Sequence, residues 1–387
     1  MNPIVIIGSG LAGFNTLKEF RKLDKETPVV VLTADDGRSY SKPMLSTGFT
    51  KQKSADELAM ANAEQVAEQF NVTVRTHVHV AGIDTAKQRV LLPDDHLDYS
   101  ALVLALGADT WTPPLEGDAV GEVFSVNDLI DYGRFRQALE GKKSVTILGG
   151  GLIGCEFAND LSNGGFQVSL VEPMGRCLPM LLPEPASAAV GRGLEELGVT
   201  FHFGPLAKAV HHRHGGPGER DMLVTELSDG SHIESDAVLS AIGLRPRIDL
   251  AKQAGLNTNR GILTDQTLRT SADKVYALGD CAEVGGHVLP YVLPLMASAR
   301  ALAKTLAGEV TPVSYGVMPV TIKTPACPVV VCPVPDEVEG EWRIEENGND
   351  VTALFEDRDG KLRGYALTGE AIKEKMKLNK ELPALMP

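Results

Sequence analysis

Residues 145–157, VTILGGGLIGCEF, join an apolar strand to a glycine-rich turn and to the start of a helix. The same unit occurs at the start of the chain, where residues 4–13 are IVIIGSGLAG. In both units the glycines follow the GxGxxG spacing directly after an apolar run that predicts a strand buried on both faces. A chain that carries this unit twice is expected to contain two parallel-sheet domains, each with a nucleotide site.

The three glycines of each unit have separate tasks. The first makes the tight turn after the strand, and the second lets the backbone approach a pyrophosphate. The third lets the helix pack closely on the strand, so that the amide groups at the helix N-terminus face the phosphates. We therefore predict phosphate-binding loops formed by Gly8, Ser9, Gly10, Leu11, Ala12 and Gly13 in the first unit, and by Gly149, Gly151 and Gly154 in the second.

The acid that follows each unit differs in position. In the second unit, the strand GFQVSLVE ends at Glu172, which is 172 − 149 = 23 residues after Gly149. That distance is close to the ~20 residues at which a carboxylate binds the adenine ribose, and this charge would repel the 2′-phosphate of NADPH, so we expect NADH here. The corresponding strand of the first unit has Thr33 at its end and reaches an acid only at Asp35, after Ala34. The ribose contact of the first nucleotide therefore stays open.

The composition is that of an ordinary globular protein. The chain has 387 residues, of which 43% are hydrophobic, and this length suggests two or three domains. Its formal net charge of −14 argues against nucleic acid or an anionic membrane as the main partner. Five cysteines are an odd number for a disulfide framework, and the first strand begins almost at Met1. We therefore expect a cytoplasmic, reduced setting with no signal peptide or membrane anchor.

Three further stretches resemble the two-dinucleotide flavoprotein reductases. Residues 275–282, VYALGDCA, are similar to the second flavin fingerprint of that family, which implies that Asp280 binds the ribityl chain of FAD. Residues 102–109, LVLALGAD, are similar to the stretch where the chain leaves the FAD domain. Residues 239–251, LSAIGLRPRIDLA, which include Gly243, are similar to the stretch where it returns. The resemblance implies FAD on the first unit and NADH on the second.

The same resemblance implies two charged side chains near the flavin. The segment SYSKPMLST at residues 39–47 is similar to the family segment that lies along the flavin and the pyrophosphate, so Lys42 would supply positive charge there. Glu156 completes the family's GxGxxGxE arrangement and would lie near the flavin ring. An ordinary loop lysine and an early-helix acid favoured by the helix dipole remain open as alternatives.

Three other contacts are also implied by the resemblance. Val80 lies in HVHVAGID, which matches a family strand whose backbone meets the adenine of FAD. Val292 precedes a helix that we expect to be entered at Pro294, and the N-terminus of that helix would face the flavin. Lys323, the single charge in VTIKTPA, would point toward the flavin or extend into water. We expect no side chain to act as a catalytic group, because FAD carries the chemistry, and no metal site.

Cys327 and Cys332 have the CxxxxC spacing of a redox-active dithiol. In the two-dinucleotide family such a pair follows the first unit on a helix, where this chain has no cysteine. The valines at residues 329–331 favour a strand, and an odd offset of five places the two side chains on opposite faces. We expect two core cysteines and no dithiol relay. Electrons that enter as hydride would then leave singly from the flavin, which suits a one-electron protein carrier.

The order of the motifs predicts the organisation of the chain. We expect an α/β protein with two Rossmann-like dinucleotide-binding domains, for FAD and NAD, and a small C-terminal α+β domain. The C-terminal part has strand-like runs separated by turns, followed by a helical segment at residues 370–382. The expected boundaries are 1–110 for the first part of the FAD-binding domain, 111–240 for the NAD-binding domain, 241–312 for the second part of the FAD-binding domain and 313–387 for the C-terminal domain.

Across nearly its whole length the sequence resembles the rubredoxin–NAD(+) reductase family of alkane-oxidising and related bacteria. The most particular stretches are ADDGRSYSKPMLSTGF at residues 34–49 and MPVTIKTPACP at residues 318–328. The resemblance implies electron transfer from NADH through FAD to rubredoxin, which would feed an alkane hydroxylase or another rubredoxin-dependent oxidase. A ferredoxin reductase of an oxygenase system is the alternative enzyme. A non-catalytic NADH-sensing flavoprotein is the alternative from another class.

The helical segment at residues 370–382 suggests a docking surface. At helical spacing Lys373, Lys377 and Lys380 share one face, and rubredoxins as a family are acidic. A solvated surface helix whose lysines balance nearby acids is an equally good interpretation.

Overall fold

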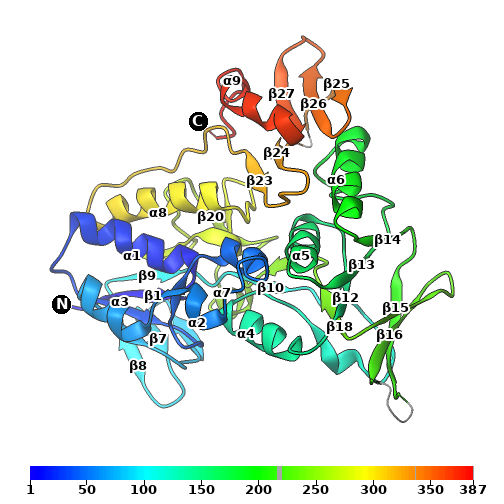
Figure 1. Cartoon of the computed structure of the whole chain (residues 1–387). Helices are drawn as coiled ribbons and strands as arrows, with labels where there is room; N and C mark the ends of the chain where they lie inside the picture. The colour runs from blue at the N-terminus through cyan, green and yellow to red at the C-terminus, as the bar shows by residue number, and fades with distance from the viewer. Residues whose placement is uncertain (216–219, 336, 387) are drawn as a thin grey trace.

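The computed structural model describes residues 1–215, 220–335 and 337–386, which form three lobes (Figure 1). The first lobe is built on a parallel five-stranded sheet in the order β21-β9-β1-β2-β5. Every residue of β1 and β2 is buried, as the apolar runs predict, because other elements cover both faces of the sheet. The strands, in sheet order, are Val275–Ala277, Ala101–Leu104, Ile4–Ile7, Val29–Leu32 and Thr73–Arg75.

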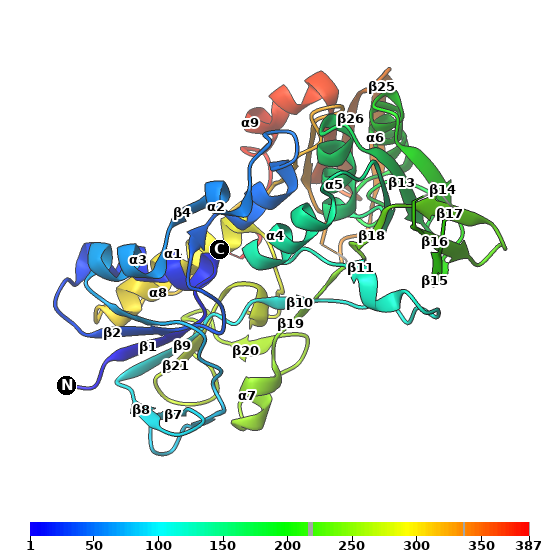
Figure 2. The ribbon, with the colours of Figure 1, turned by 60° about the horizontal axis from the view of Figure 1, so that its bottom comes forward.

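Helices and a small sheet cover the two faces of this first sheet. Helices α1 and α8 pack side by side on one face (Figure 1), and a three-stranded antiparallel sheet lies on the other (Figure 2). The helices are α1 Leu11–Leu23, α3 Ala63–Phe70 and α8 Val292–Leu306, and the small sheet is β6 Gly82–Asp84, β7 Arg89–Leu91 and β8 His96–Asp98. Helix α8 begins at Val292, two residues before Pro294, so the expected entry was wrong. Val80 lies in coil between β5 and β6, so the strand expected there was also wrong.

The second lobe repeats the parallel architecture in the order β11-β18-β12-β13-β14. Its strands are Val123–Phe124, Ala237–Ser240, Ser144–Leu148, Gln167–Glu172 and Thr200–Phe203, with helices α4 Leu129–Ala138, α5 Leu152–Asn163 and α6 Glu184–Glu196. A three-stranded antiparallel sheet extends from it, formed by β15 Ala207–Arg213, β16 Met222–Leu227 and β17 His232–Ser235. The fold class predicted from the two glycine units is therefore confirmed.

Two chain crossings connect the first and second lobes. Strand β10, Ala108–Thr110, pairs antiparallel with β19, Leu244–Pro246, so the outgoing and returning stretches lie side by side (Figure 2). The returning chain continues through α7 Asp249–Gln253 and through β20 Ile262–Thr264, which pairs with β22 Ala282–Val284. Short elements complete the description: β3 Ser39–Tyr40, η1 Lys42–Thr47, α2 Ala55–Leu58, β4 Ala59–Ala61, η2 Val120–Glu122 and η3 Gly279–Cys281.

The C-terminal lobe is an antiparallel sheet in the order β23-β24-β27-β26-β25. Its strands are Val320–Ile322, Val329–Cys332, Leu362–Thr368, Asp350–Asp357 and Gly340–Asn347. The helical segment expected at residues 370–382 is confirmed only in part, because it is shorter and is not one continuous α-helix. The chain instead forms a 3-10 turn, η4 Gly369–Glu374, and a four-residue helix, α9 Lys375–Leu378. The turn begins against the sheet, because the amide of Glu370 donates to Asp350 on β26. The helical spacing assumed for Lys373, Lys377 and Lys380 therefore does not apply.

The hydrophobic cores do not follow the three lobes one by one. One cluster fills the first lobe around β1 and β9. A second contains the core of the second lobe, residues Leu45, Phe49 and Leu58 from the early part of the chain, and Val329 and Val331 from the C-terminal sheet. The C-terminal sheet therefore shares a packed core with the second lobe. No helix in the described parts of the chain is long and apolar enough to cross a membrane.

Candidate functional site: two glycine loops and the cavity at the first

The two glycine loops have nearly the same backbone. Gly8 has φ +115° and Gly149 has φ +101°, values that L side chains rarely adopt. A Cβ added to Gly13 would collide with the carbonyl of Gly8, and one added to Gly154 would collide with that of Gly149. These close approaches bring α1 and α5 against their strands. The helix N-cap residues are glycines, Gly10 and Gly151, which have no side chain to cap the first amides. Both helix ends are thus suited to anions.

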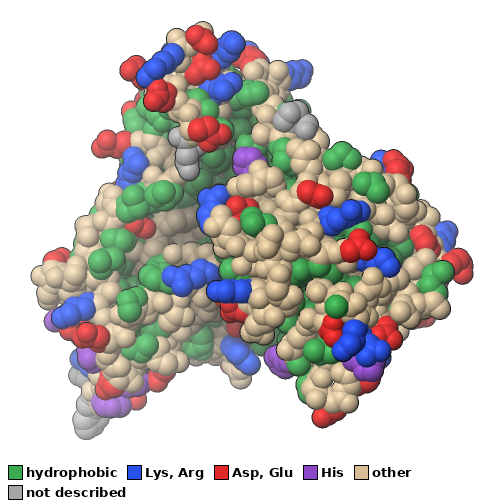
Figure 3. All heavy atoms as spheres, turned by 180° about the vertical axis from the view of Figure 1, so that it is seen from behind, with side chains coloured by type: hydrophobic (Ala, Val, Ile, Leu, Met, Phe, Trp, Pro, Cys, Tyr) green, Lys and Arg blue, Asp and Glu red, His purple; other side chains and the backbone are tan. Residues whose placement is uncertain are grey.

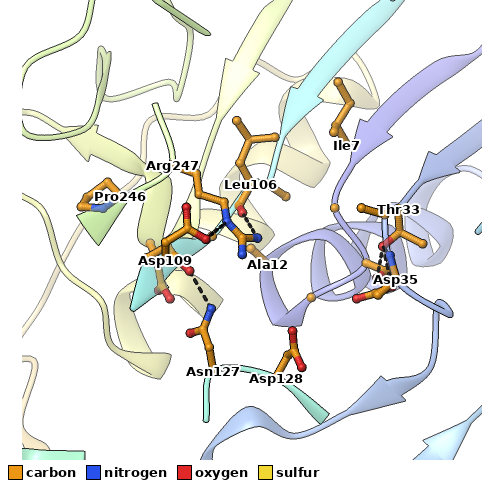
Figure 4. Close-up of a pocket in the computed structure, with 18 of the residues that line it drawn as sticks. Ile7, Ala12, Thr33, Asp35, Leu106, Asp109, Asn127, Asp128, Pro246 and Arg247 are labelled. Carbon is orange, nitrogen blue, oxygen red and sulfur yellow. Dashed lines mark hydrogen bonds and ion pairs between the residues drawn. The ribbon is translucent and has the colours of Figure 1, made fainter. Parts of the chain in front are cut away.

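A cavity of about 1190 Å³ opens at the first loop (Figure 4). It extends from the end of β1 past segment 42–47 to the paired crossing strands. Eleven of the predicted cofactor residues line it: Gly8, Ser9, Gly10, Leu11, Ala12, Thr33, Ala34, Asp35, Lys42, Val80 and Asp280. Gly13 serves this site by packing against Gly8. The long shape, the uncapped helix end and the flanking polar groups fit a dinucleotide such as FAD.

Asp35 is one of the acids that line this cavity. Its Oδ1 accepts hydrogen bonds from Thr33 Oγ1 at 2.6 Å, from Ser9 Oγ at 3.0 Å and from the amide of Gly37 at 2.9 Å. Thr33 and Asp35 therefore form one polar group at the end of β2 (Figure 4). The ribose contact of the first nucleotide stays a prediction, and Thr33 and Asp35 are its candidates.

Lys42 brings positive charge to the middle of the cavity. Its Nζ donates to Oδ1 of Asn127 at 2.8 Å and lies 3.8 Å from Oδ2 of Asp280. Burial lowers the pKa of Lys42, and the nearby Asp280 carboxylate opposes this shift. Lys42 is therefore placed beside the acid expected to hold the ribityl chain.

Several lining residues were missed by the sequence reasoning. Arg247 forms an ion pair with Asp109 at 2.6 Å and also donates to the carbonyl of Leu106 (Figure 4). Asn127 donates to the carbonyl of Ala108, and Arg245 stacks on Trp111. Arg245 and Arg247 belong to the stretch IGLRPR, which signalled a crossing but not a cavity wall. They reach the cavity because β10 and β19 pair.

The second loop holds its acid differently. Glu172 is buried, and its carboxylate accepts from the amide of Gly150 at 2.7 Å and from that of Met174 at 2.8 Å. A Cβ on Gly150 would approach Cβ of Glu172 to 2.9 Å, so the glycine makes room for the acid. Gly243, at φ +126°, follows β18 and accepts from the amide of Trp111. The predicted residues of this unit lie outside the first cavity, at the carboxyl ends of β12 and β13.

The three remaining predicted residues lie elsewhere. Glu156 and Lys323 form an ion pair with each other, and neither lines the first cavity. Val292 is the first residue of α8 and is 41% exposed, whereas its neighbour Leu295 reaches the cavity. The roles proposed for these three residues at the flavin therefore stay predictions.

The five cysteines are all free and buried. Cys327 packs in the core shared with the second lobe, and Cys332 packs in a separate cluster with Tyr365 and Leu378 on the opposite side of the sheet. Cys327 lies in the turn before β24 rather than on the strand. Burial raises the pKa of Cys332 to about 11 and raises that of Cys327 as well. The prediction of two core cysteines on opposite faces is confirmed.

A second cavity, of about 810 Å³, separates the first lobe from the C-terminal lobe. It is lined by His287 and Tyr291 and, from the C-terminal lobe, by Val334 and Arg363, and Arg260 borders both cavities. Seen from behind, the surface is hollowed below the C-terminal lobe, with Lys and Arg side chains on the margin (Figure 3). No group of three or more potential metal ligands occurs in the described ranges.

Comparison with known proteins agrees with this geometry. Residues 2–305 match the family described as pyridine nucleotide-disulphide oxidoreductase, and residues 312–382 match the family described as rubredoxin binding C-terminal domain. A crystal structure of the ferredoxin reductase for the CYP199A2 system from Rhodopseudomonas palustris has a TM-score of 0.86 at 24% identity. It covers 99% of this chain and 96% of its own, and it shows the same fold.

Two curated relatives match along the full chain. The rubredoxin-NAD(+) reductase of Alcanivorax borkumensis is 80% identical over 387 residues, which is 100% of both chains. The rubredoxin-NAD(+) reductase of Acinetobacter baylyi is 43% identical and is aligned over 100% of this chain and 99% of its own. With two glycine units, a dinucleotide cavity and these matches, the chain belongs to the pyridine nucleotide-disulphide oxidoreductase family.

Proposed function

We propose that this chain is an NADH-dependent flavoprotein reductase that passes electrons through FAD to rubredoxin. One observation carries the proposal. The part of the chain that follows the two nucleotide units matches a rubredoxin-binding domain, and the full-length relatives are rubredoxin-NAD(+) reductases. FAD and NADH are the cofactors, and rubredoxin is the partner.

The residues that would hold FAD are those of the first cavity. The uncapped amides at the start of α1 would receive the pyrophosphate, the Thr33–Asp35 group would receive the ribose, and Asp280 would receive the ribityl chain. Lys42 would add positive charge near the phosphates. When bound, FAD accepts a hydride from NADH and releases the electrons one at a time. We propose the division 1–110 and 241–312 for the FAD-binding domain, 111–240 for the NAD-binding domain and 313–387 for the C-terminal domain.

The residues that would hold NADH are those of the second loop. The first amides of α5 would bind its pyrophosphate, and Glu172 would exchange its bonds to Gly150 and Met174 for the ribose hydroxyls. Gly243 would let this nucleotide pass close to the crossing strands. We keep Glu156, Val292 and Lys323 as proposed neighbours of the flavin.

The cysteines support a direct exit of electrons from FAD. Both candidate relay thiols are buried on opposite sides of one sheet, so they do not share a site. We propose the cytoplasm as the location, supported by five free thiols. The downstream enzyme that we propose is an alkane hydroxylase or another rubredoxin-dependent oxidase, an assignment that rests on the family resemblance.

The test is steady-state NADH oxidation by the FAD-loaded protein with rubredoxin, with ferredoxin and without a protein acceptor. We expect rapid, rubredoxin-dependent turnover, because the C-terminal lobe is of the rubredoxin-binding kind. Faster turnover with ferredoxin would favour the ferredoxin reductase alternative. NADH binding without turnover on either carrier would favour the NADH-sensing flavoprotein.

A further inference from the structure

Helix α5 carries three buried polar side chains that bind other parts of the molecule. Glu156, Asn159 and Asp160 are 0%, 2% and 2% exposed. The carboxylate of Asp160 accepts from the amides of Phe49 and Thr50, at 2.9 and 2.8 Å. Asp160 thus fastens the end of the segment that begins at Lys42, which lines the cofactor cavity. Burial raises the pKa of Asp160 against the effect of these hydrogen bonds.

The same face of α5 also holds the C-terminal lobe. Oδ1 of Asn159 accepts from the amide of Ala326 at 3.0 Å, and Oε1 of Glu156 accepts from the amide of Lys323 at 2.9 Å. The ammonium of Lys323 forms an ion pair with Oε2 of Glu156, and this oxygen also accepts from Ser46 at 2.6 Å. One buried carboxylate therefore joins segment 42–47, helix α5 and strand β23.

The packing around this carboxylate is continuous. Val320 and Ile322, on β23 just before Lys323, belong to the core of the second lobe. On helix α6, a Cβ added to Gly193 would approach Cβ of Cys327 to 2.8 Å, so the helix backbone lies directly against the turn after β23. The C-terminal lobe and the second lobe are thus packed as one body. Helix α5 begins at the loop proposed for NADH, and its buried polar side chains also contact the acceptor-binding lobe.

We propose that Glu156 is a positioning residue that acts through Lys323. By holding Lys323 and β23 against α5, it sets the place of the acceptor-binding lobe relative to segment 42–47, and transfer of electrons to the protein acceptor depends on that placement. Removing the ammonium leaves a buried carboxylate without its cation, and removing the carboxylate leaves Lys323 without its partner, so either change disturbs this junction. Small displacements of a bound partner are sufficient to slow a reaction. The inference rests on the proposed function.

The test is a double-substitution cycle on the FAD-loaded full chain, with Glu156→Gln, Lys323→Gln and both together. The readouts are kcat/KM for rubredoxin, kcat and KM for NADH with ferricyanide, FAD content and thermal stability. Arg192→Ala is the matched control. Arg192, on α6, binds Asn349 and Gly348 and so joins the same two lobes through a separate contact. Its loss weakens the lobe contact without touching the junction at Glu156.

We expect each single substitution to lower kcat/KM for rubredoxin by about tenfold, and the double substitution to lower it no further, because both act on one junction. Turnover with ferricyanide should change less than rubredoxin reduction does, and Arg192→Ala should change stability alone. Effects that multiply to about a hundredfold in the double variant would overturn the proposal, since the two residues would then act independently. So would unchanged rubredoxin kinetics, or an equal loss in Arg192→Ala.

The proposed function fails separately, because it is measured on the unsubstituted protein. If that protein does not reduce rubredoxin with NADH, the function is wrong whatever the variants show. If it does, the cycle alone decides the role of Glu156.

Discussion

The two glycine loops have nearly the same backbone conformation, but they differ in the acidic residue that lies next to them. In both loops, the first glycine has a positive φ, the second faces open space, and the third packs against the carbonyl of the first. The acids differ. Asp35 lies beyond its strand and gathers the hydroxyls of Thr33 and Ser9, whereas Glu172 ends its strand and binds the amide of Gly150 within the loop itself. The backbone conformation suits each loop to phosphate groups, and we propose that the side chains decide which nucleotide each loop binds.

The surroundings extend this difference. The first loop opens on a large cavity. The crossing strands and Lys42 also line this cavity. The second loop leads into α5, whose buried side chains bind the C-terminal lobe. This difference fits our proposal that the first unit encloses FAD as a resident cofactor and that the second binds NADH, which must arrive and leave.

The largest effect is expected from substitutions that disrupt one glycine loop at a time. Gly154→Ala places a methyl group against the Gly149 carbonyl, and Gly13→Ala does the same at Gly8. Overpacking of about 1–3 kcal/mol corresponds to losses of up to about a hundredfold in affinity. We expect Gly154→Ala to raise KM for NADH while FAD stays bound, and Gly13→Ala to lower FAD content, both read by absorbance and NADH titration. Gly191→Ala, on α6 with no atom within 4 Å of the new Cβ, is the control. Loss of FAD in Gly154→Ala would show that the loops are not separate sites.

The next effect concerns the acid of the second loop. We expect Glu172→Ala to raise KM for NADH by about tenfold and to narrow the preference for NADH over NADPH, because the carboxylate that binds the ribose and repels a 2′-phosphate is gone. Glu172→Gln removes the charge but keeps an oxygen that can accept from the amide of Gly150 or Met174. It therefore separates the effect of the charge from that of the hydrogen bonds to the loop. Steady-state kinetics with both nucleotides measure this. Equal use of NADH and NADPH by the unsubstituted protein would contradict the assignment.

A smaller effect is expected from the lysines of the C-terminal segment, where rubredoxin could dock. Lys373 is paired with Glu370, so the reversal is made at Lys375, Lys377 and Lys380. If this surface steers rubredoxin, the triple change to glutamate should slow second-order rubredoxin reduction by about fivefold at low salt and flatten its salt dependence. Ferricyanide reduction should not change. Identical salt slopes would assign these lysines to ordinary surface charge and move docking to the cavity between the first and C-terminal lobes.

The smallest effect is expected at the cysteines. Cys327→Ser with Cys332→Ser should leave NADH-to-rubredoxin turnover within about twofold, because neither unit passes electrons to a thiol pair and the two side chains do not meet. Stability should fall modestly, since both thiols pack in cores. Stopped-flow reduction and turnover of the FAD-loaded double variant provide the measurement. Abolished turnover would mean that a thiol relay exists.

Local patterns predicted what local geometry decides. Each glycine unit, with its strand, turn and helix, lies within about 30 residues, the range in which hydrophobic period and turn chemistry can be read. The strand ending at Glu172 follows from the same reasoning, whereas Cys327 lies in the turn before β24, so strand periodicity does not by itself explain why it and Cys332 lie on opposite sides of the sheet. The helical segment expected at residues 370–382 is confirmed only in part, and in its first turn the amide of Glu370 donates to Asp350 on β26, a tertiary contact that no pattern within the segment predicts.

The sequence by itself determined the fold class and the two glycine loops, and its resemblance predicted the cofactors and the acceptor. Only the tertiary structure decided that Glu156 pairs with Lys323, 167 residues away, and that the C-terminal sheet shares the core of the second lobe. It also decided that Arg247 and Asp109 close the cavity from paired crossing strands. Contacts of this kind depend on how separate elements pack against one another. No pattern along the chain specifies that packing residue by residue, because apolar faces of similar shape can pack in many ways until all of them are buried together.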